Sequence, residues 1–406
     1  YAVDVAGTGT AGLALARDHE QRARLLYQQT AVLQGRGRLK DALGSCLAAL
    51  ELATPGEAFF YLSASQALHV SRSLGAIEAF NDLARRVEAV RPRPGARGEF
   101  LAFQSAAALT HFETGNADAL ERISEAVERF VSDRPVLTPA EAGVLMGVRS
   151  ICSYQHGDLT AAYAHAVDAA QTFAAAGISI SVLLSQINVA AMLLAVGLDA
   201  DAERFARHVV SEFARRGRYA PEAELMLAEV LLRRGSVGEA LAMLDALAAR
   251  TTQLGDRRAY GAVQLHRADA LLALGRADDA REAAQAAVEI ADSLGQSHVM
   301  AGALTLWADA ERRCGDLERA YEHATRASEI AVRMRRLASF EARLSRVLVE
   351  LARAGMGDDE ARAVAEAAVG RVRRFAAKIA DPAWRAAYLA IDDHAALLRH
   401  AEELGV

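Results

Sequence analysis

The chain is short of the residue types that mark several classes of protein. Among its 406 residues there are three cysteines, Cys46, Cys152 and Cys314, which lie far apart and form no CxxC-type spacing. Neither a disulfide framework nor a cysteine zinc site is expected, and the thiols are interpreted as reduced and partly buried in a cytoplasmic protein. Lysine occurs only at Lys40 and Lys378, so arginine carries almost all of the positive charge. This usage is typical of GC-rich bacterial coding.

The sequence also lacks the usual signatures of catalysis and cofactor binding. Its eleven histidines form no HExxH motif and no metal pair four residues apart, and neither a GxxxxGK[ST] loop nor a GxSxG elbow occurs. The run Asp392-Asp393-His394 is interpreted as the start of a helix, where paired acids suit the helix dipole. We therefore expect a protein that is not an enzyme and that binds no metal and no cofactor.

An excess of charge of one sign is absent as well. The formal net charge is -6, while hydrophobic residues make up 52% of the chain and charged residues 24%. This composition supports a folded core rather than a disordered tail. Because nucleic-acid-binding modules normally carry a basic excess on one face, we expect no nucleic acid as a partner.

One stretch without charge is long enough to cross a membrane. No charged residue occurs between Asp168 and Asp199, and residues 178–198 could span a bilayer. Serine, glutamine and asparagine interrupt this stretch, and Gly197 falls in phase with the repeat described next. The stretch is therefore predicted to be a buried central helix, and no membrane partner is expected.

What is abundant is a repeated glycine between an apolar run and an alanine-rich run. It recurs at spacings of 38 to 42 residues, at Gly37, Gly75, Gly115, Gly157, Gly197, Gly235, Gly275, Gly315 and Gly355. A fixed period of this length predicts a solenoid of stacked two-helix units. A second series, Gly177, Gly217, Gly255 and Gly295, falls where each second helix should end, because glycine adopts the left-handed C-cap conformation at little cost.

Small residues recur around the turn glycine of each unit. Counting that glycine as position fifteen, position eight holds alanine or serine in units three to eight, and position twenty holds alanine in most units. This pattern resembles the tetratricopeptide repeat, in a stretched form similar to the helical domains of bacterial signalling ATPases, kinases and MalT-like or LuxR-type regulators. Phe80 and Leu120 break the pattern at position twenty, and Ala361 comes one residue late. The units that contain them are expected to pack at different angles.

The resemblance implies an all-α, right-handed α-solenoid of about nine helix-turn-helix repeats over residues 21–377. Residues 378–406 are expected to add two short capping helices, in which Trp384, Tyr388 and Leu397 cover the last repeat. Residues 1–20 contain Gly7, Gly9 and Gly12 in a GxGxxG pattern, which is interpreted as part of a linker because no second strand follows it. The chain as a whole is interpreted as the carboxyl-terminal part of a larger bacterial signalling protein.

In the repeats that this chain resembles, the first helix of each unit lines the concave face. Position nine then gives a ladder of carboxylates in units six to eight, with arginines beside it: Glu229, Asp269, Asp309, Arg233, Arg312 and Arg313. Units three to five present an apolar surface instead: Phe112, Val144, Ile151, Tyr154, Ile187, Ala191 and Leu194. The alternatives are that the charges only bridge neighbouring helices, and that the array covers its own apolar face.

The resulting hypothesis is a non-catalytic scaffold or sensor that binds a protein segment or peptide on its concave face. The expected partner is basic and amphipathic, because it meets an apolar floor at one end and carboxylates at the other. Two alternatives remain open. One is a small-molecule effector domain of a transcriptional regulator, and the other is a module that inhibits a kinase or ATPase encoded upstream in the same polypeptide.

Overall fold

The computed structural model describes residues 18–132, 136–335, 340–355 and 357–406. Within these ranges the chain forms α-helices and one short 3-10 helix, and no strand occurs. The GxGxxG pattern of the amino-terminal stretch lies outside the described residues.

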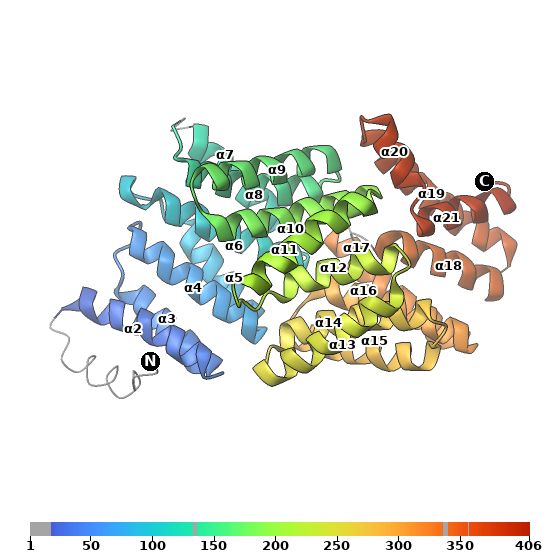
Figure 1. Cartoon of the computed structure of the whole chain (residues 1–406), viewed down its shortest axis with the longest axis horizontal. Coiled ribbons are helices and arrows are strands. Elements are labelled where there is room, and N and C mark those ends of the chain that lie inside the picture. Colours follow the sequence, from blue (N-terminus) through green and yellow to red (C-terminus); the bar gives the residue numbers. More distant parts are fainter. Residues whose placement is uncertain (1–17, 133–135, 336–339, 356) are drawn as a thin grey trace.

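The helices follow one another as nine antiparallel pairs, as Figure 1 shows. The first helices of the pairs are α2 (His19–Gly35), α4 (Ala58–Leu74), α6 (Arg97–Thr114), α8 (Pro139–Gln155), α10 (Ser179–Val196), α12 (Pro221–Arg233), α14 (Arg257–Ala273), α16 (Ser297–Cys314) and α18 (Glu341–Gly355). The second helices are α3 (Leu39–Leu52), α5 (Ile77–Glu88), α7 (Ala117–Ser132), α9 (Leu159–Ala175), α11 (Asp199–Arg215), α13 (Val237–Leu254), α15 (Ala277–Ser293), α17 (Leu317–Met334) and α19 (Asp358–Lys378). Two short helices, α20 (Pro382–Leu389) and α21 (Asp392–Glu403), close the chain. The predicted α-solenoid with a terminal helix pair is confirmed.

Local sequence explains why the helices begin and end where they do. Gly75 and Gly115 end α4 and α6 with φ of 70° and 74°, a left-handed conformation that glycine adopts without strain. At the other end, Asp256 caps α14 by accepting a hydrogen bond from the backbone N–H of Ala259 at 3.0 Å. The small residues predicted for the packing of the two helices, such as Ala268, are fully buried.

The second unit departs from this regular packing. Helix α5 packs on α4 but not along α6, unlike the second helices of the other described pairs. Phe80, which replaces the usual small residue, is fully buried, and its ring meets that of His111 on α6 edge-on at 4.9 Å. The large ring therefore fills the space into which the second helix would otherwise settle.

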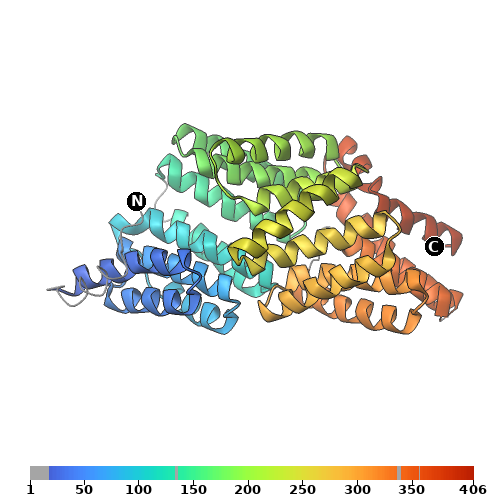
Figure 2. The same ribbon diagram turned by 60° about the horizontal axis from the view of Figure 1, so that its bottom comes forward.

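The array coils so tightly that it meets itself. The turn at Gly75 in unit two packs against Leu294 in unit seven, where an added Cβ would lie 2.5 Å from the Leu294 Cα. Asp118 of unit three forms an ion pair with Arg335, at the end of unit eight, with 2.6 Å between the charged atoms. One superhelical turn thus takes five units, and Figure 2 shows the amino-terminal helices beside the orange helices of units seven and eight. We call this contact of units two to four with units seven to nine the seam.

The terminal helix pair does more than cover the last repeat. Tyr388 and Leu397 are buried against α18 and α19, as predicted. Trp384, however, packs edge-on against Tyr163 of unit four, with 5.0 Å between the ring centroids. Helix α20 therefore continues the seam and joins unit nine to units four and five, because it also packs against α10.

The uncharged stretch forms α10, the first helix of the fifth pair. Among the described helices it alone is long and apolar enough to cross a membrane, and 44% of its residues are buried. It packs lengthwise against α9 and α11, its neighbours in the chain. The structure thus gives this helix a place within the repeat array.

Candidate functional site

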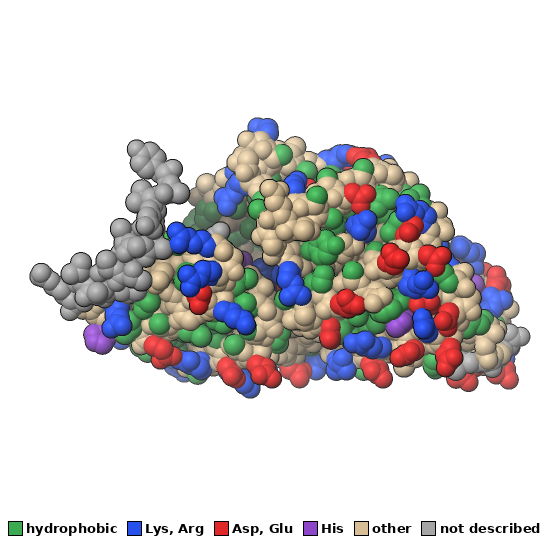
Figure 3. All heavy atoms as spheres, turned by 90° about the horizontal axis from the view of Figure 1, so that it is seen from below, with side chains coloured by type: hydrophobic (Ala, Val, Ile, Leu, Met, Phe, Trp, Pro, Cys, Tyr) green, Lys and Arg blue, Asp and Glu red, His purple; other side chains and the backbone are tan. Residues whose placement is uncertain are grey.

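The inner surface of the coil contains an apolar cavity of about 230 Å³. Six of the residues predicted for the concave face line it: Phe112, Ile151, Tyr154, Ala191, Leu194 and Glu229. They come from units three to six, in which α6 packs against α8 and α10 packs against α12. In the space-filling view, hydrophobic side chains line a recess between the amino-terminal lobe and the middle of the molecule (Figure 3).

The wall opposite these helices comes from beyond the seam. His298 of α16 lines the apolar cavity, and its ring lies 5.8 Å from that of Phe112. Burial lowers the pKa of His298, so the imidazole is neutral at pH 7 and adds little charge to the apolar wall. Sequence analysis missed this residue because it lies outside the concave positions of its own unit.

A second, polar cavity of about 320 Å³ adjoins the first one. Glu229 lines both, and the polar cavity is also bordered by Arg233, Asp269 and Arg343. A third cavity of about 60 Å³ lies beneath the terminal helices and shares Tyr154 with the first and Arg233 with the second. Because they share walls, we treat the three cavities as one channel.

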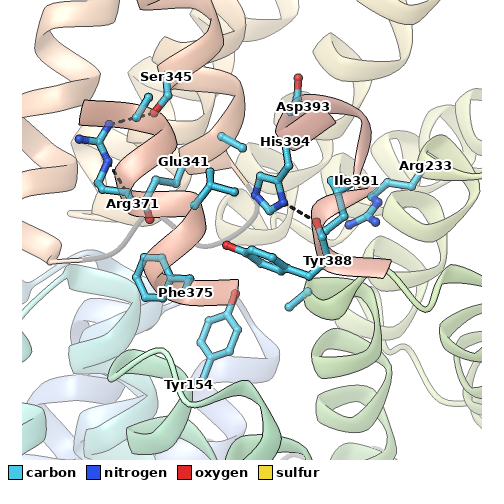
Figure 4. Close-up of a pocket in the computed structure, with 14 residues that line it drawn as sticks. Tyr154, Arg233, Glu341, Ser345, Arg371, Phe375, Tyr388, Ile391, Asp393 and His394 are labelled. Atoms are coloured by element: carbon cyan, nitrogen blue, oxygen red, sulfur yellow. Dashed lines mark hydrogen bonds and ion pairs between the residues drawn. The ribbon is translucent and has the colours of Figure 1, made fainter. Parts of the chain in front are cut away.

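The terminal helices form one wall of the third cavity, as Figure 4 shows. Tyr388 and His394 face the third cavity from the cap, while Tyr154 approaches it from α8. The His394 Nδ1 lies 2.6 Å from the backbone oxygen of Tyr388, which holds the ring in place. On the far side, Arg371 of α19 donates a hydrogen bond to the Ser345 hydroxyl at 3.1 Å.

The predicted ladder of carboxylates is only partly open to a ligand. Asp269 is ion-paired with Arg343 of α18. Asp309 is fully buried and is held by Arg312 at 2.7 Å and Arg313 at 3.0 Å. The expectation that Asp309 faces a basic partner is therefore corrected, whereas Asp269 still lines the polar cavity. The alternative, in which such charges bridge neighbouring helices, describes their geometry better.

Electrostatics keeps the buried carboxylate of Asp309 ionised. Burial raises its pKa, but the guanidinium groups of Arg346 and Arg313 lower it further, so the pKa lies well below its usual range. Arg346 and Arg343 come from α18, and sequence analysis missed both because unit nine is out of phase with the repeat. They also pair with Asp393 of the cap, at 2.8 and 3.1 Å. Asp393 thus belongs to this charge network, besides standing at the start of α21 as expected.

The other predicted residues have structural partners. Arg233 donates to the backbone oxygen of Leu194 and to the Asp199 carboxylate, both at 2.8 Å. Val144 and Ile187 are half-buried, pack on the hydrophobic core and do not border the apolar cavity. The apolar residues near Tyr154 are therefore the part of the predicted surface that the fold gathers into one place.

The polar cavity keeps an excess of acid. Its lining includes five carboxylates, on Asp199, Glu229, Asp269, Asp392 and Asp393, against the two guanidinium groups of Arg233 and Arg343. None of the described arginines lies within ion-pair distance of Glu229. Burial raises the pKa of Asp199 in spite of its pairing with Arg233. Among the described residues, no group of three His, Cys, Asp or Glu side chains is arranged to hold a metal ion.

Comparison with known proteins defines the class of fold. No protein-family model matches the sequence, and no curated protein does either. A solved structure of a Rap protein complexed with competence and sporulation factor is similar over 85% of this chain and 97% of that chain, with 13% identity and a TM-score of 0.58. The Rap conjugation gene regulator of plasmid pLS20, in complex with the Phr* peptide, is similar over 89% and 98%, with 13% identity and a TM-score of 0.56. This chain is therefore a tetratricopeptide-like α-solenoid.

A third similarity corrects one expectation. The human IFIT1 dimer with m7Gppp-AAAA, a capped RNA, is similar over 99% of this chain and 93% of that chain, with 11% identity and a TM-score of 0.52. A solenoid of this shape is thus found with RNA. The exclusion of nucleic acid from the mild negative charge was wrong, because net charge does not describe the local charge of an inner surface.

Proposed function

We propose that this protein binds a short polypeptide segment in the channel and acts as a non-catalytic sensor or scaffold of a bacterial signalling system. The observation that carries the proposal is the junction of the apolar and polar cavities at Glu229. An extended peptide presents apolar side chains and unpaired backbone groups side by side, and this junction offers partners for both. The Rap structures with peptides support the proposal as structures of similar fold.

Energetics favours a ligand that places an apolar side chain among Phe112, Ile151 and Ala191. Burying one Leu- or Phe-sized side chain there contributes about 1.5–3 kcal/mol. At the other cavity, Glu229 is half-buried and free to pair with a cationic group or a backbone N–H. Such a charge-assisted hydrogen bond would fix the direction of the ligand.

A small-molecule effector is the second candidate. It is supported by the wall that His298 adds to the apolar cavity. A concave and mostly apolar cavity with a few polar groups suits a compact ligand. The two candidates differ in the ligand and share the site.

The test is selection of displayed random heptapeptides by the protein, beside two tryptophan variants. Ala191→Trp fills the apolar cavity, whereas Ala174→Trp adds the same ring to an exposed position of α9. We expect the selected peptides to bind Ala191→Trp at least tenfold more weakly than the natural chain, and to bind Ala174→Trp with unchanged affinity.

Peptides that bind both variants equally would contradict a peptide site in the channel. If no peptide is selected, a metabolite screen by thermal shift tests the second candidate, since a ligand of the folded state raises the melting temperature. A shift that Ala191→Trp abolishes would identify a small effector instead of a peptide.

A further inference from the structure

The seam lies directly over the proposed ligand site. Phe112 belongs to unit three and His298 to unit eight, and their rings meet across the seam above the apolar cavity. Separation of the two sides would therefore expose this cavity. We propose that the seam is a clasp, which opens to let a ligand enter or leave the channel and then closes over it. The ligand part of this inference rests on the proposed function.

The two sides of the seam have separate hydrophobic cores. One core runs from Leu33 to Cys152, in units one to four, and another runs from Leu265 to Leu351, in units seven to nine. Between them, units four to seven contain only small clusters, such as that around Leu183 and Phe213. Because the two large cores are separate, bending of the units between them would let the end bodies move apart without disrupting either core.

Where the bodies meet, ion pairs and turns make most of the contact. Glu113 of unit three is paired with Arg258 of unit seven and also with Arg72 at 3.3 Å. Farther along, Arg335 binds Asp118 and Glu121, both at 2.6 Å. The Arg335 pairs are exposed, so they are weak and are screened by salt, and opening is expected to begin there. Glu113, Arg72 and Arg258 are largely buried, so their pairs hold the seam more firmly.

The other end of the seam is held differently. Leu159 and Val196 of units four and five share one hydrophobic cluster with Tyr388 and Leu397 of the cap. This apolar contact fastens units four and five to the carboxyl-terminal end. The opening movement is therefore expected at units two and three, with the cap end as the hinge.

Arg335 provides an independent sign that closure has a cost. Among the described residues it is the only non-glycine residue with positive φ, at 60°, and it ends α17. A side chain with a Cβ is strained in this conformation. In this conformation it forms both ion pairs across the seam. We infer that opening, which breaks both pairs, lets Arg335 leave the strained conformation.

A disulfide across the seam tests the clasp most directly. An added Cβ on Gly295 would lie 3.6 Å from the Cβ of Ile77, within the roughly 3.5–4.5 Å range of disulfides. We would make Ile77→Cys with Gly295→Cys in a Cys314→Ser background, because Cys314 is the exposed natural thiol. The probe is 1-aminoanthracene, a neutral dye that fluoresces in apolar cavities, and Ala191→Trp identifies the fraction bound in the channel.

We expect the oxidised variant to take up and release the dye at least tenfold more slowly than its reduced form. In the same samples, amides in the last turns of α6 and α17 should exchange at least tenfold more slowly with solvent after oxidation. Equal amide exchange in the two forms would overturn the clasp, whatever binds in the channel. Slower amide exchange with unchanged dye kinetics would overturn the gating role and leave the proposed peptide site intact.

A complementary variant should loosen the clasp. Glu113→Gln with Arg335→Gly removes the ion pairs and relieves the positive φ, so dye exchange and amide exchange should both accelerate at least threefold. The matched control is Glu239→Gln, which removes the Arg207 pair at 2.8 Å between adjacent units, away from the seam. If the control accelerates exchange as much as the seam variant, the seam has no special role in opening.

Discussion

Two turn glycines of the same repeat position meet different surroundings. Gly75 and Gly275 both follow a first helix, with φ of 70° and 75°. An added Cβ at Gly275 would have nothing within 4 Å, whereas at Gly75 it would lie 2.5 Å from the Leu294 Cα and 2.8 Å from the Ser293 oxygen. The backbone conformation of the turn favours glycine at both positions. At Gly75 the contact across the seam is a second reason, because it leaves no room for a side chain.

The same contrast holds for charged and polar positions. Asp309 and Glu229 share position nine of their units, yet Asp309 is fully buried among arginines while Glu229 lines an open cavity. His111 occupies position eleven of unit three, where unit seven has Leu271, and both are buried. Equivalent positions of the repeat therefore differ in burial and in contacts, according to which other units pack against them.

The largest expected effect is at Asp309. Asp309→Asn leaves the buried guanidinium groups around it without a full counter-charge, which should destabilise the fold by about 3–5 kcal/mol. The control is Asp279→Asn, which removes an exposed pair with Arg276 at 2.6 Å and should cost at most about 1 kcal/mol. Urea unfolding at pH 7 measures both. Equal losses would mean that burial of position nine does not matter.

The pH dependence of Asp309 has a defined sign. Its folded pKa is depressed, so its contribution to stability is complete above the unfolded value of about 3.9 and is lost as pH falls below it. The difference in stability between the natural chain and Asp309→Asn should therefore stay constant from pH 7 to about 5 and shrink as the pH falls below about 4.

The next effect is expected at His111. The equivalent position of unit seven holds Leu271, so leucine is the natural substitution to test. Both ring nitrogens of His111 lack hydrogen-bond partners among the described residues, and burial lowers its pKa to about 4. The unfolded state then binds the proton first, so this residue makes stability fall as pH drops from about 6.5 to 4, by of order 2–3 kcal/mol.

His111→Leu should remove that part of the pH dependence. It should also raise the free energy of unfolding at pH 7 by about 1–3 kcal/mol, because the substitution removes a buried polar group that has no hydrogen-bond partner. Urea midpoints at pH 7 and pH 5 give both numbers. A destabilised variant with an unchanged pH profile would show that the imidazole has a partner in solution.

The last comparison is between the two glycines themselves. Gly275→Ala should cost about 1–2 kcal/mol, the penalty of the left-handed conformation for a residue with a Cβ. Gly75→Ala should cost about 1–3 kcal/mol more, because the methyl group overpacks the backbone of Leu294 or forces the seam apart. Equal unfolding free energies for the two variants would indicate that the seam is open in solution.

Much of this architecture could be predicted from repeated residues. The glycine period and the small residues of each unit indicated nine helix pairs and a closing pair, because helix ends and close packing of two adjacent helices are local properties. The apolar wall around Phe112, Tyr154 and Ala191 was predicted for the same reason. Its helices are neighbours in sequence as well as in space.

The rest of the channel could not be predicted in this way. His298 meets Phe112 from five units away, and Asp393 reaches the polar cavity from the cap. Nothing in the period states how many units make a turn, so these neighbours could not be assigned. The phase shift in unit nine also concealed Arg343 and Arg346, which pair with Asp269 and Asp309.

The sequence by itself thus determined the helix pairs, their caps and the apolar character of one stretch of the inner face, because these depend on conformational preference and contacts within one or two units. Tertiary structure alone decided that five units complete a turn, that the ladder of acids is largely neutralised and that residues from both sides of the seam line the apolar cavity. Small angles between successive units add up over the array, and their sum determines which distant residues meet.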